Sequence, residues 1–354
     1  MKNYRKNIIQ ESCSIEQALK KLNEISDYFP DHPLTLLITN KQQQLVGTLT
    51  DGDIRRTLVA GSKLDDRVSS CMNKDFVSLK KNGLEYHSVS AYKEKGVKLL
   101  PIQNDGKEIV KVYNLSKFKS ILPLETIIMA GGMGTRLRPM TFETPKSLLN
   151  VGNKPIIQHN VDRLLMYGIE NITFTIRYLG DQIVSHFSNG NGEGMNVRFI
   201  REDEPLGTAG GLSLIDGFKS ETILLTNSDV LTTLNYEEFY LDFIKREADI
   251  SVVTIPYIVK VPFGVFDIQN DSVSSLKEKP EYTYFANAGI YLIKKELIDQ
   301  IPKNKHLDIT DFIEKQIAGE KNVVSFPFWG YWLDIGKPED FENAQKAIQI
   351  LDCY

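Results

Sequence analysis

The N-terminal third of the chain is predicted to begin with an amphipathic helix followed by two strands. Apolar residues within 15–25 recur at the spacing of one helix face, and Ser14 with Gln17 provides a capping box at the start of this helix. Apolar runs at 34–38 and 45–50, separated by a polar turn, are typical of short strands. A second helix is expected to begin in the acidic segment that follows them.

The same order of elements returns 64 residues later without a gap. A strand is expected at 109–114 and a helix from Ser116. The repeat is longer than the unit of a solenoid, so two copies predict a pseudo-symmetric pair of small α/β modules. The residues that align between the copies are Leu36 with Leu100, Ile38 with Ile102, Asn40 with Asn104, and Val46 with Val110.

A second domain is predicted after this repeat. Pro123 breaks the helix expected from Ser116, and an apolar strand at 126–130 begins shortly after it. We therefore divide the chain into domains at 1–122 and 123–354. A short, wholly apolar strand suits the centre of a parallel sheet buried on both faces, so the second domain is expected to be α/β.

A glycine-rich segment, 131–134, follows the first strand of this domain. Glycines at the carboxyl end of a strand let backbone amides approach phosphate oxygens, and open α/β sheets place ligands at this edge. The segment does not fit a dinucleotide-binding fingerprint, because Leu137 stands where a third small residue is needed. It does not fit a Walker A loop either, because Pro145 rather than glycine precedes Lys146.

Composition and charge narrow the range of partners. A net charge of −4 gives no electrostatic support for nucleic acid or an anionic membrane surface, and no apolar run approaches the ~20 residues of a membrane span. Three widely separated cysteines, Cys13, Cys71 and Cys353, indicate neither a zinc site nor a disulfide framework. We therefore expect a cytoplasmic protein without a nucleic-acid or membrane partner.

The loop and its neighbours form a specific motif. It reads Ala130-Gly131-Gly132-Met133-Gly134-Thr135-Arg136-Leu137-Arg138-Pro139, followed by Pro145-Lys146. This motif closely resembles that of the nucleotidyltransferases that make nucleotide sugars from sugar 1-phosphates, and the resemblance extends over 126–345. It implies a Rossmann-like, GT-A-like domain with a mainly parallel mixed sheet. The phosphate-loop contacts that it implies are Ala130, Gly131, Gly132, Gly134 and Thr135.

Further motifs extend this resemblance along the chain. Asp229 follows a buried strand at 222–226, and the resemblance implies that Asp229 and Asp334 bind Mg²⁺. The catalytic cations that it implies are Arg136, Lys146 and Lys279, which would neutralise two anionic substrates. The sugar contacts that it implies are Gly264, Glu278, Asn287 and Gly289. The nucleotide contacts that it implies are Glu202, Pro205, Gly207 and Thr208.

The base is predicted from the segment Gly207-Thr208-Ala209-Gly210. This tetrapeptide resembles that of guanylyltransferases for mannose or heptose phosphates, although some uridylyltransferases share it. Glu202 can accept hydrogen bonds from N1 and the exocyclic amine of guanine, an adjacent donor pair that adenine and thymine lack. The partners expected for this domain are therefore GTP and a sugar 1-phosphate.

The repeat at the N-terminus resembles a CBS-domain pair, most clearly in Leu45–Arg55. In that family, residues at the positions of Thr50 and Asp53 hold the phosphate and ribose of an adenine nucleotide. The second copy carries Asn114 and Lys117 at these positions, so at most one such site is expected to be intact. The pair also implies self-association as a homodimer or higher homo-oligomer.

A CBS pair ahead of a nucleotidyltransferase is most similar to the glucosamine-1-phosphate guanylyltransferases of bacterial legionaminic-acid biosynthesis. The function predicted from this resemblance is guanylyl transfer from GTP to glucosamine 1-phosphate, for a surface glycan or nonulosonic acid. Three alternatives stay open from the sequence. They are a mannose- or heptose-1-phosphate guanylyltransferase, a nucleotidyltransferase for another phosphate such as phosphocholine, and a catalytically silent subunit that only binds nucleotide.

Overall fold

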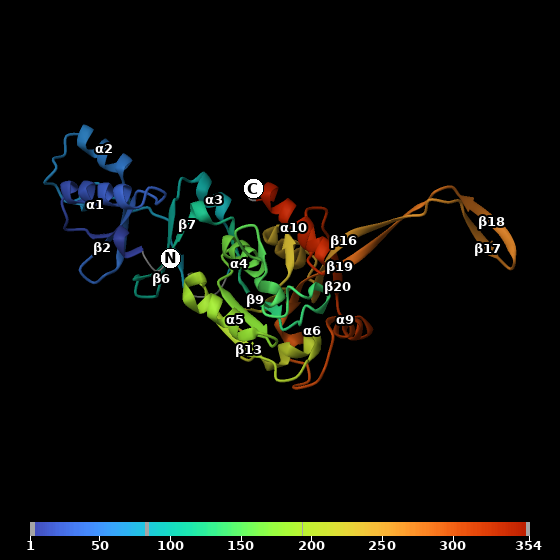
Figure 1. Ribbon diagram of the computed structural model, residues 1–354. Helices are drawn as coiled ribbons and strands as arrows, with labels where there is room; N and C mark the ends of the chain where they lie inside the picture. The colour runs from blue at the N-terminus through green and yellow to red at the C-terminus, as the bar shows by residue number, and fades with distance from the viewer. Residues whose placement is uncertain (1–3, 82–84, 193, 352–354) are drawn as a thin grey trace. The chain divides into compact units, whose positions relative to one another are not determined.

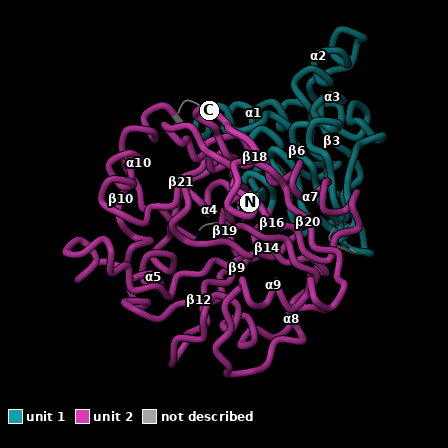
Figure 2. The backbone as a smooth tube through the Cα atoms, turned by 90° about the vertical axis from the view of Figure 1, so that its right-hand side faces the viewer, with its two compact units in different colours: residues 1–123, 165–168 teal, residues 124–164, 169–354 magenta. Residues whose placement is uncertain are grey.

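The computed structural model describes residues 4–81, 85–192 and 194–351, which form two compact units (Figures 1 and 2). Unit 1 runs to Pro123 and includes 165–168, and unit 2 contains 124–164 and 169–354. The boundary between the two units thus falls after Pro123, whereas the sequence placed it after residue 122. Cys353 lies outside the described residues.

The first module of unit 1 has the predicted order of elements. Helix α1 (Ile15–Tyr28) begins with the capping box of Ser14 and Gln17, in which each side chain bonds the other residue's amide. Its apolar face packs on a three-stranded sheet of order β1-β2-β3. The elements that complete this module are β1 (Ile8–Gln10), β2 (Thr35–Thr39), β3 (Leu45–Thr50) and α2 (Asp51–Val59).

The second module repeats this arrangement with smaller elements. Its sheet has the order β4-β6-β7, and residues from both modules form one apolar cluster. The amide of Leu45 also donates to the carbonyl of Lys107 at 2.9 Å. The elements of the module are β4 (Leu79–Lys80), β5 (His87–Ser88), α3 (Val89–Glu94), β6 (Leu99–Gln103), β7 (Ile109–Asn114) and β8 (Ser120–Ile121).

The helix predicted from Ser116 is wrong. The chain makes only a 3-10 turn, Leu115–Lys117, and then enters the short strand β8, which pairs with β5. The side chain of Asn114 accepts a hydrogen bond from the amide of Ser116 and closes this turn locally. An extended chain then buries both Ile121 and Leu122, which are 6 and 2 % exposed.

Unit 2 is built on a seven-stranded mixed sheet of order β13-β12-β9-β14-β19-β16-β20. Strands β13, β12, β9 and β14 are parallel, β19 is antiparallel to both neighbours, and β20 is parallel to β16. The mixed α/β fold expected from the sequence is confirmed. The strands are β9 (Leu124–Ala130), β12 (Asn171–Ile176), β13 (Asn196–Arg201), β14 (Thr222–Asn227), β16 (Ile250–Lys260), β19 (Glu281–Lys294) and β20 (Val323–Pro327).

The order of the strands fixes where a ligand can bind. The chain runs from β9 outward through β12 to β13, and then returns to place β14 on the other side of β9. Loops at the carboxyl ends of β9 and β14 therefore diverge, which leaves a crevice at this edge of the sheet. The predicted phosphate loop follows β9, and Asp229 lies just beyond β14.

Helices and two short strand pairs complete unit 2. Among the residues that the structure describes, no helix has the length and apolar character needed to cross a bilayer. The helices are α4 (Ile156–Met166), α5 (Gly180–His186), α6 (Gly207–Gly210), α7 (Tyr236–Lys245), α8 (Lys295–Ile298), α9 (Ile309–Ala318) and α10 (Pro338–Leu351). The short strands are β10 (Asn150–Val151), β11 (Lys154–Pro155), β15 (Val230–Thr232) and β21 (Trp332–Asp334).

Strands β16 and β19 continue beyond the sheet as a two-stranded arm, which we define as residues 255–286 (Figure 1). Strand β20 stops pairing with β16 at Thr254, and β14 pairs with β19 only from Ile290 onward. The outer part of the arm is a second antiparallel pair, β17 (Val265–Gln269) and β18 (Ser272–Lys277).

Candidate active site

The glycine loop after β9, residues 131–134, is held by side chains outside it. The hydroxyl of Thr141 donates to the carbonyl of Gly134 at 2.8 Å. The hydroxyl of Tyr178 lies 3.2 and 3.0 Å from the carbonyls of Thr141 and Phe142. These bonds fix the segment between the glycines and Lys146, so the loop is shaped before a ligand binds.

Lys146 lies between two carboxylates from distant parts of the chain. Its ammonium donates to Asp229 and lies 3.5 Å from an oxygen of Asp334. The side chains of Lys146 and Asp229 are 14 and 18 % exposed, so this ion pair is largely shielded from water. Three residues that the sequence assigned to one site are thus together in space.

The pairing of β15 with β21 brings the two carboxylates together. Val230 is opposite Asp334 in this short ladder, and the amide of Ile335 donates to the carbonyl of Asp229 at 3.1 Å. Burial and the nearby charge of Asp229 raise the pKa of Asp334, while Lys146 and Arg136 act in the opposite direction. Arg136 lies near this pair, because a Cβ built on Gly336, two residues after Asp334, would be 3.4 Å from its guanidinium.

A cavity of about 340 Å³ opens beside this cluster, at the carboxyl ends of β9 and β14. Of the residues predicted from the sequence, those that line it are Ala130, Gly131, Gly132, Lys146, Glu202, Pro205, Gly207, Thr208 and Asp229. Residues that the sequence analysis missed also line it, among them Arg177 and Asp308. Arg177 comes just after β12 and Asp308 just before α9, and no local motif marks either.

Glu202 faces the cavity from the end of β13. Burial raises the pKa of its carboxyl, and this effect is opposed by the amide of Leu206, the hydroxyl of Thr175 and the charge of Arg177. A side chain built on Gly211 would lie only 2.6 Å from a carboxylate oxygen of Glu202. The small residue at 211 therefore provides the space that Glu202 occupies.

The tetrapeptide Gly207-Thr208-Ala209-Gly210 is tied to the start of α9. The amides of Ala209 and Gly210 both donate to the carbonyl of Leu307 at 2.9 Å, and the hydroxyl of Thr208 accepts from the amide of Ile309 at 2.8 Å. Thr208 lines the cavity, but its hydroxyl caps α9. The tetrapeptide therefore builds the wall of the cavity and positions Asp308.

The structure does not bring the predicted sugar contacts of the arm to this cavity. Glu278 and Lys279 are exposed, and Gly264 lies beside Glu278, because a Cβ on Gly264 would be 3.1 Å from its carboxylate. Asn287 and Gly289 lie at the root of the arm, where the side chain of Asn287 accepts from the amide of Gly289 at 2.9 Å. None of the five lines the cavity, and their roles stay predictions.

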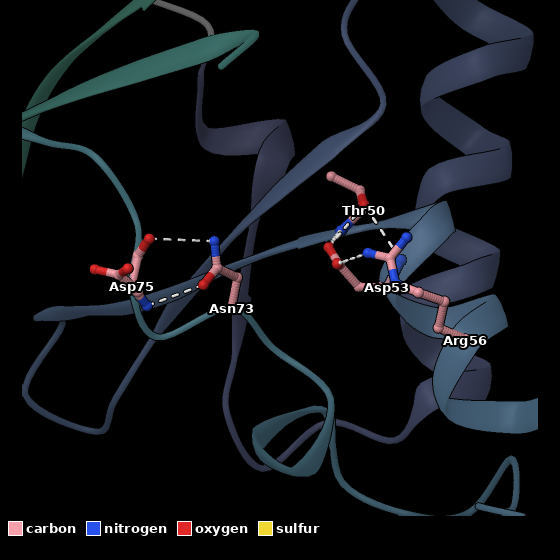
Figure 3. Close-up of polar contacts among 5 residues, drawn as sticks. All are labelled: Thr50, Asp53, Arg56, Asn73 and Asp75. Atoms are coloured by element: carbon pink, nitrogen blue, oxygen red, sulfur yellow. Dashed lines mark hydrogen bonds and ion pairs between the residues drawn. The ribbon is translucent and has the colours of Figure 1, made fainter. Parts of the chain in front are cut away.

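A second cavity, of about 610 Å³, lies in unit 1. Thr50 and Asp53 line it and form the capping box at the start of α2, with Asp53 also paired to Arg56 (Figure 3). Asn73 and Asp75, bonded to each other in a separate turn, also line the cavity (Figure 3). The start of α2 thus places a hydroxyl and a carboxylate beside this cavity, and the nucleotide contacts of Thr50 and Asp53 stay predictions.

The donor set at Asp229 and Asp334 suits a hard cation. Both side chains offer only carboxylate oxygens, which Mg²⁺ prefers, and both face the same ammonium. Within the described ranges no cluster of three or more His, Cys, Asp or Glu side chains has the geometry of a metal site. The two carboxylates would therefore need further oxygens from a phosphate or water to complete a shell.

Comparison with known proteins assigns unit 2 to a family. Residues 125–350 match the family model described as nucleotidyl transferase. The chain is 32 % identical over 229 residues to a probable mannose-1-phosphate guanylyltransferase of Oryza sativa subsp. japonica, a match that covers 62 % of this chain and 63 % of that protein. It is 29 % identical over 232 residues to a mannose-1-phosphate guanylyltransferase of Mycobacterium tuberculosis, with 64 % of each covered. The chain thus spans less than two thirds of these relatives.

Two solved structures are similar to the same region. Crystalline HddC from Yersinia pseudotuberculosis is 27 % identical, with a TM-score of 0.50, and the match covers 63 % of this chain and 99 % of that one. A putative glucose-1-phosphate thymidylyltransferase from Bacillus anthracis, in complex with a sucrose, is also 27 % identical. Its TM-score is 0.52, with 63 % of this chain and 94 % of that chain covered.

The wall around Gly207 gives a stability prediction. Gly207 and Gly217 share a left-handed backbone, with φ of +76° and +78°, but only Gly207 is crowded. A Cβ there would lie 2.6 Å from the carbonyl of Leu307, whereas nothing lies within 4 Å at Gly217. Gly217→Ala should cost about 1–2 kcal/mol from backbone strain alone, and Gly207→Ala at least about 2 kcal/mol more. Urea unfolding of both variants checks this, and equal losses would contradict it.

Proposed function

The chain belongs to the nucleotidyl transferase family, and we propose that it transfers a nucleoside monophosphate from a nucleoside triphosphate to a sugar 1-phosphate. The observation that carries this proposal is the cluster of Lys146, Asp229, Asp334 and Arg136 beside a glycine loop. Such a cluster suits a triphosphate, because it combines backbone amides, two cations and two carboxylates in a partly shielded site.

The proposed reaction needs positioning more than proton transfer. An oxygen of the sugar phosphate attacks the α-phosphorus, forms the new P–O bond, and displaces pyrophosphate as the bond to the β-phosphate oxygen breaks. The attacking oxygen already carries negative charge at neutral pH, so no general base is required. Arg136 and Lys146 would orient the triphosphate in line with the second substrate and neutralise the charge that develops on it.

We further propose that Asp229 and Asp334 hold Mg²⁺ when the triphosphate is bound. The ion would supply positive charge to the phosphate oxygens of the nucleotide. Lys146 contacts both carboxylates, so it offsets their mutual repulsion in the unliganded site. The ammonium would turn toward the phosphates as the nucleotide enters.

GTP is the proposed donor, supported by Glu202 in the cavity and by relatives named as mannose-1-phosphate guanylyltransferases. Glucosamine 1-phosphate, from the resemblance in the sequence, is our first candidate acceptor. Mannose 1-phosphate, from the names of the relatives, is the second. We place the reaction in the cytoplasm, where GTP and sugar phosphates are available.

Turnover with a panel of substrates tests this proposal. Each common nucleoside triphosphate is combined with each sugar 1-phosphate, and with phosphocholine, and pyrophosphate release is measured. Lys146→Met should lower kcat/KM at least about 100-fold, because it removes a cation from a shielded phosphate site. Lys154→Met is the matched control, since Lys154 pairs with Asp162 at the surface and should change turnover less than about 3-fold.

Three outcomes would contradict parts of the proposal. No turnover with any pair would favour a silent nucleotide-binding subunit. Turnover of phosphocholine alone would exclude a sugar phosphate as the acceptor. Near-normal turnover in Lys146→Met would exclude the role of Lys146 in binding the triphosphate.

The choice of base gives a separate prediction for Glu202. Guanine offers two adjacent donors to a carboxylate, and a hydrogen bond to a charged group contributes about 1.5–3 kcal/mol. Glu202→Gln should therefore lower kcat/KM for GTP roughly 10–100-fold, since each 1.4 kcal/mol is tenfold. The ratio of kcat/KM for GTP to kcat/KM for ATP should fall as well. Glu204→Gln, exposed and outside the cavity, is the control. Equal losses for GTP and ATP would exclude a role in reading the base.

For unit 1 we propose a CBS pair that binds an adenine nucleotide in its 610 Å³ cavity, supported by Thr50 and Asp53 at the start of α2. Asp53→Asn should weaken binding of AMP, ADP or ATP at least tenfold, because a carboxylate accepts both ribose hydroxyls and an amide accepts less well. Asp51→Asn, on the same helix turn but outside the cavity, should bind normally. Calorimetry on the full chain measures this, and equal affinities of both variants would contradict it.

A further inference from the structure

The arm exposes more apolar surface than an isolated element normally carries. Ten of its large apolar side chains are between 37 and 72 % exposed. They are Tyr257, Ile258, Val259, Phe263, Phe266, Ile268, Val273, Leu276, Tyr284 and Phe285. Figure 1 shows the arm leaving the body of unit 2 with no other described element beside β17 and β18.

The extent of this surface matches what a stable partner requires. If each side chain presents on the order of 100 Å², about half the area of a large aromatic residue, the arm exposes on the order of 1,000 Å². Successive residues of a strand point to opposite faces, so this area is divided between the two faces of the arm. A partner that encloses the arm would bury about the 800 Å² of one side of a standard protein interface. The arm therefore has the size and character of an interface.

The outer part of the arm also carries residues that the sequence predicts to contact the sugar phosphate. Gly264, Glu278 and Lys279 lie together there, and Lys279 has a left-handed backbone with φ of +45° before Pro280. A residue other than glycine held in this conformation costs free energy, and such strain is concentrated at functional sites. Lys279 is exposed, and the carboxylate of Glu278 is its neighbour in the chain.

The 340 Å³ cavity of unit 2 has few positive charges for two anionic substrates. Its lining includes two cations, Lys146 and Arg177, and Lys146 is already paired with two carboxylates. A triphosphate and a sugar phosphate together carry several negative charges. Arg136, Lys146 and the proposed Mg²⁺ are assigned to the triphosphate, so a further cation would favour binding of the second anion beside it.

The arm cannot bring Lys279 back to the cavity of its own chain as the structure stands. Seven consecutive pairs, from Thr254 with Asn287 to Lys260 with Glu281, form an unbroken ladder. Lys279 lies eight residues before Asn287, or about 25 Å along an extended strand. The root is fixed as well, because the indole of Trp332 donates to the carbonyl of Ala288 at 2.9 Å.

We propose that the arm docks on a second copy of this chain and places Lys279 and Glu278 at the cavity of that copy. The exchange is reciprocal in a two-fold dimer, so each cavity is completed by the arm of the other subunit. There Lys279 binds the phosphate of the second substrate and Glu278 accepts hydroxyls of its sugar. This inference rests on the proposed function for the identity of that substrate, whereas docking of the arm does not.

Complementation between two inactive variants tests the proposal. Lys146→Met disables a cavity and Lys279→Met disables an arm. Heterodimers of the two, isolated through two different affinity tags, contain one intact cavity that receives one intact arm. They should recover about half of the wild-type turnover if the arm acts on the other subunit. Turnover of no more than a few per cent, with active wild-type protein, would overturn the proposal and leave the proposed function standing.

The oligomeric state tests docking without any activity. Light scattering after gel filtration should show a wild-type dimer. Phe266→Ser should shift the protein toward monomer with an unchanged circular dichroism spectrum. Ile317→Ser on α9 is the matched control, since Ile317 and Phe266 are both 56 % exposed. A wild-type monomer at tens of micromolar, or a dimer that Phe266→Ser leaves intact, would overturn the proposal even if no substrate turns over.

Discussion

The ammonium of Lys146, between the carboxylates of Asp229 and Asp334, is the interaction on which the candidate site depends. Two carboxylates this close repel each other in a partly shielded place, and the cation offsets that repulsion. Each of the three residues reaches the cluster from a different part of the topology. Lys146 follows the loop after β9, Asp229 follows β14, and Asp334 arrives through the pairing of β15 with β21. The order of the strands therefore determines which charges meet in the site.

The sequence predicted the parts of this site that carry local signals. A buried strand followed by glycines located the glycine loop, and another strand end located Asp229, because strand ends at a crossover share one edge of the sheet. The first module of unit 1 was predictable for the same reason, since the Ser14 capping box and the apolar spacing of α1 lie within one short window. What these signals share is that each depends on neighbours within about ten residues.

Features set by contacts between distant segments were not predictable. Asp308 lines the cavity because α6 is bonded to Leu307 just before α9, and Arg177 lines it because β12 ends beside β9; no spacing in the chain shows either contact. The helix expected from Ser116 failed because burial of Ile121 outweighed local propensity. The same holds for Thr208. The bond between its hydroxyl and the amide of Ile309 joins residues 101 positions apart, and the nucleotide contact that its motif predicts stays a prediction.

The position of the arm shows why a family motif does not by itself define a complete site. Order along the chain placed Lys279 between Asp229 and Asp334, yet seven strand pairs carry it away from both. In the charged cluster the ammonium of Lys146 is paired with the carboxylates of Asp229 and Asp334, so it neutralises them before it can act on a second substrate. Lys279 from a second copy would add a cation that is not already paired with Asp229 or Asp334. In the proposed dimer, Lys279 of the second copy thus supplies the positive charge for the second substrate, because Lys146 of the first copy is paired with Asp229 and Asp334.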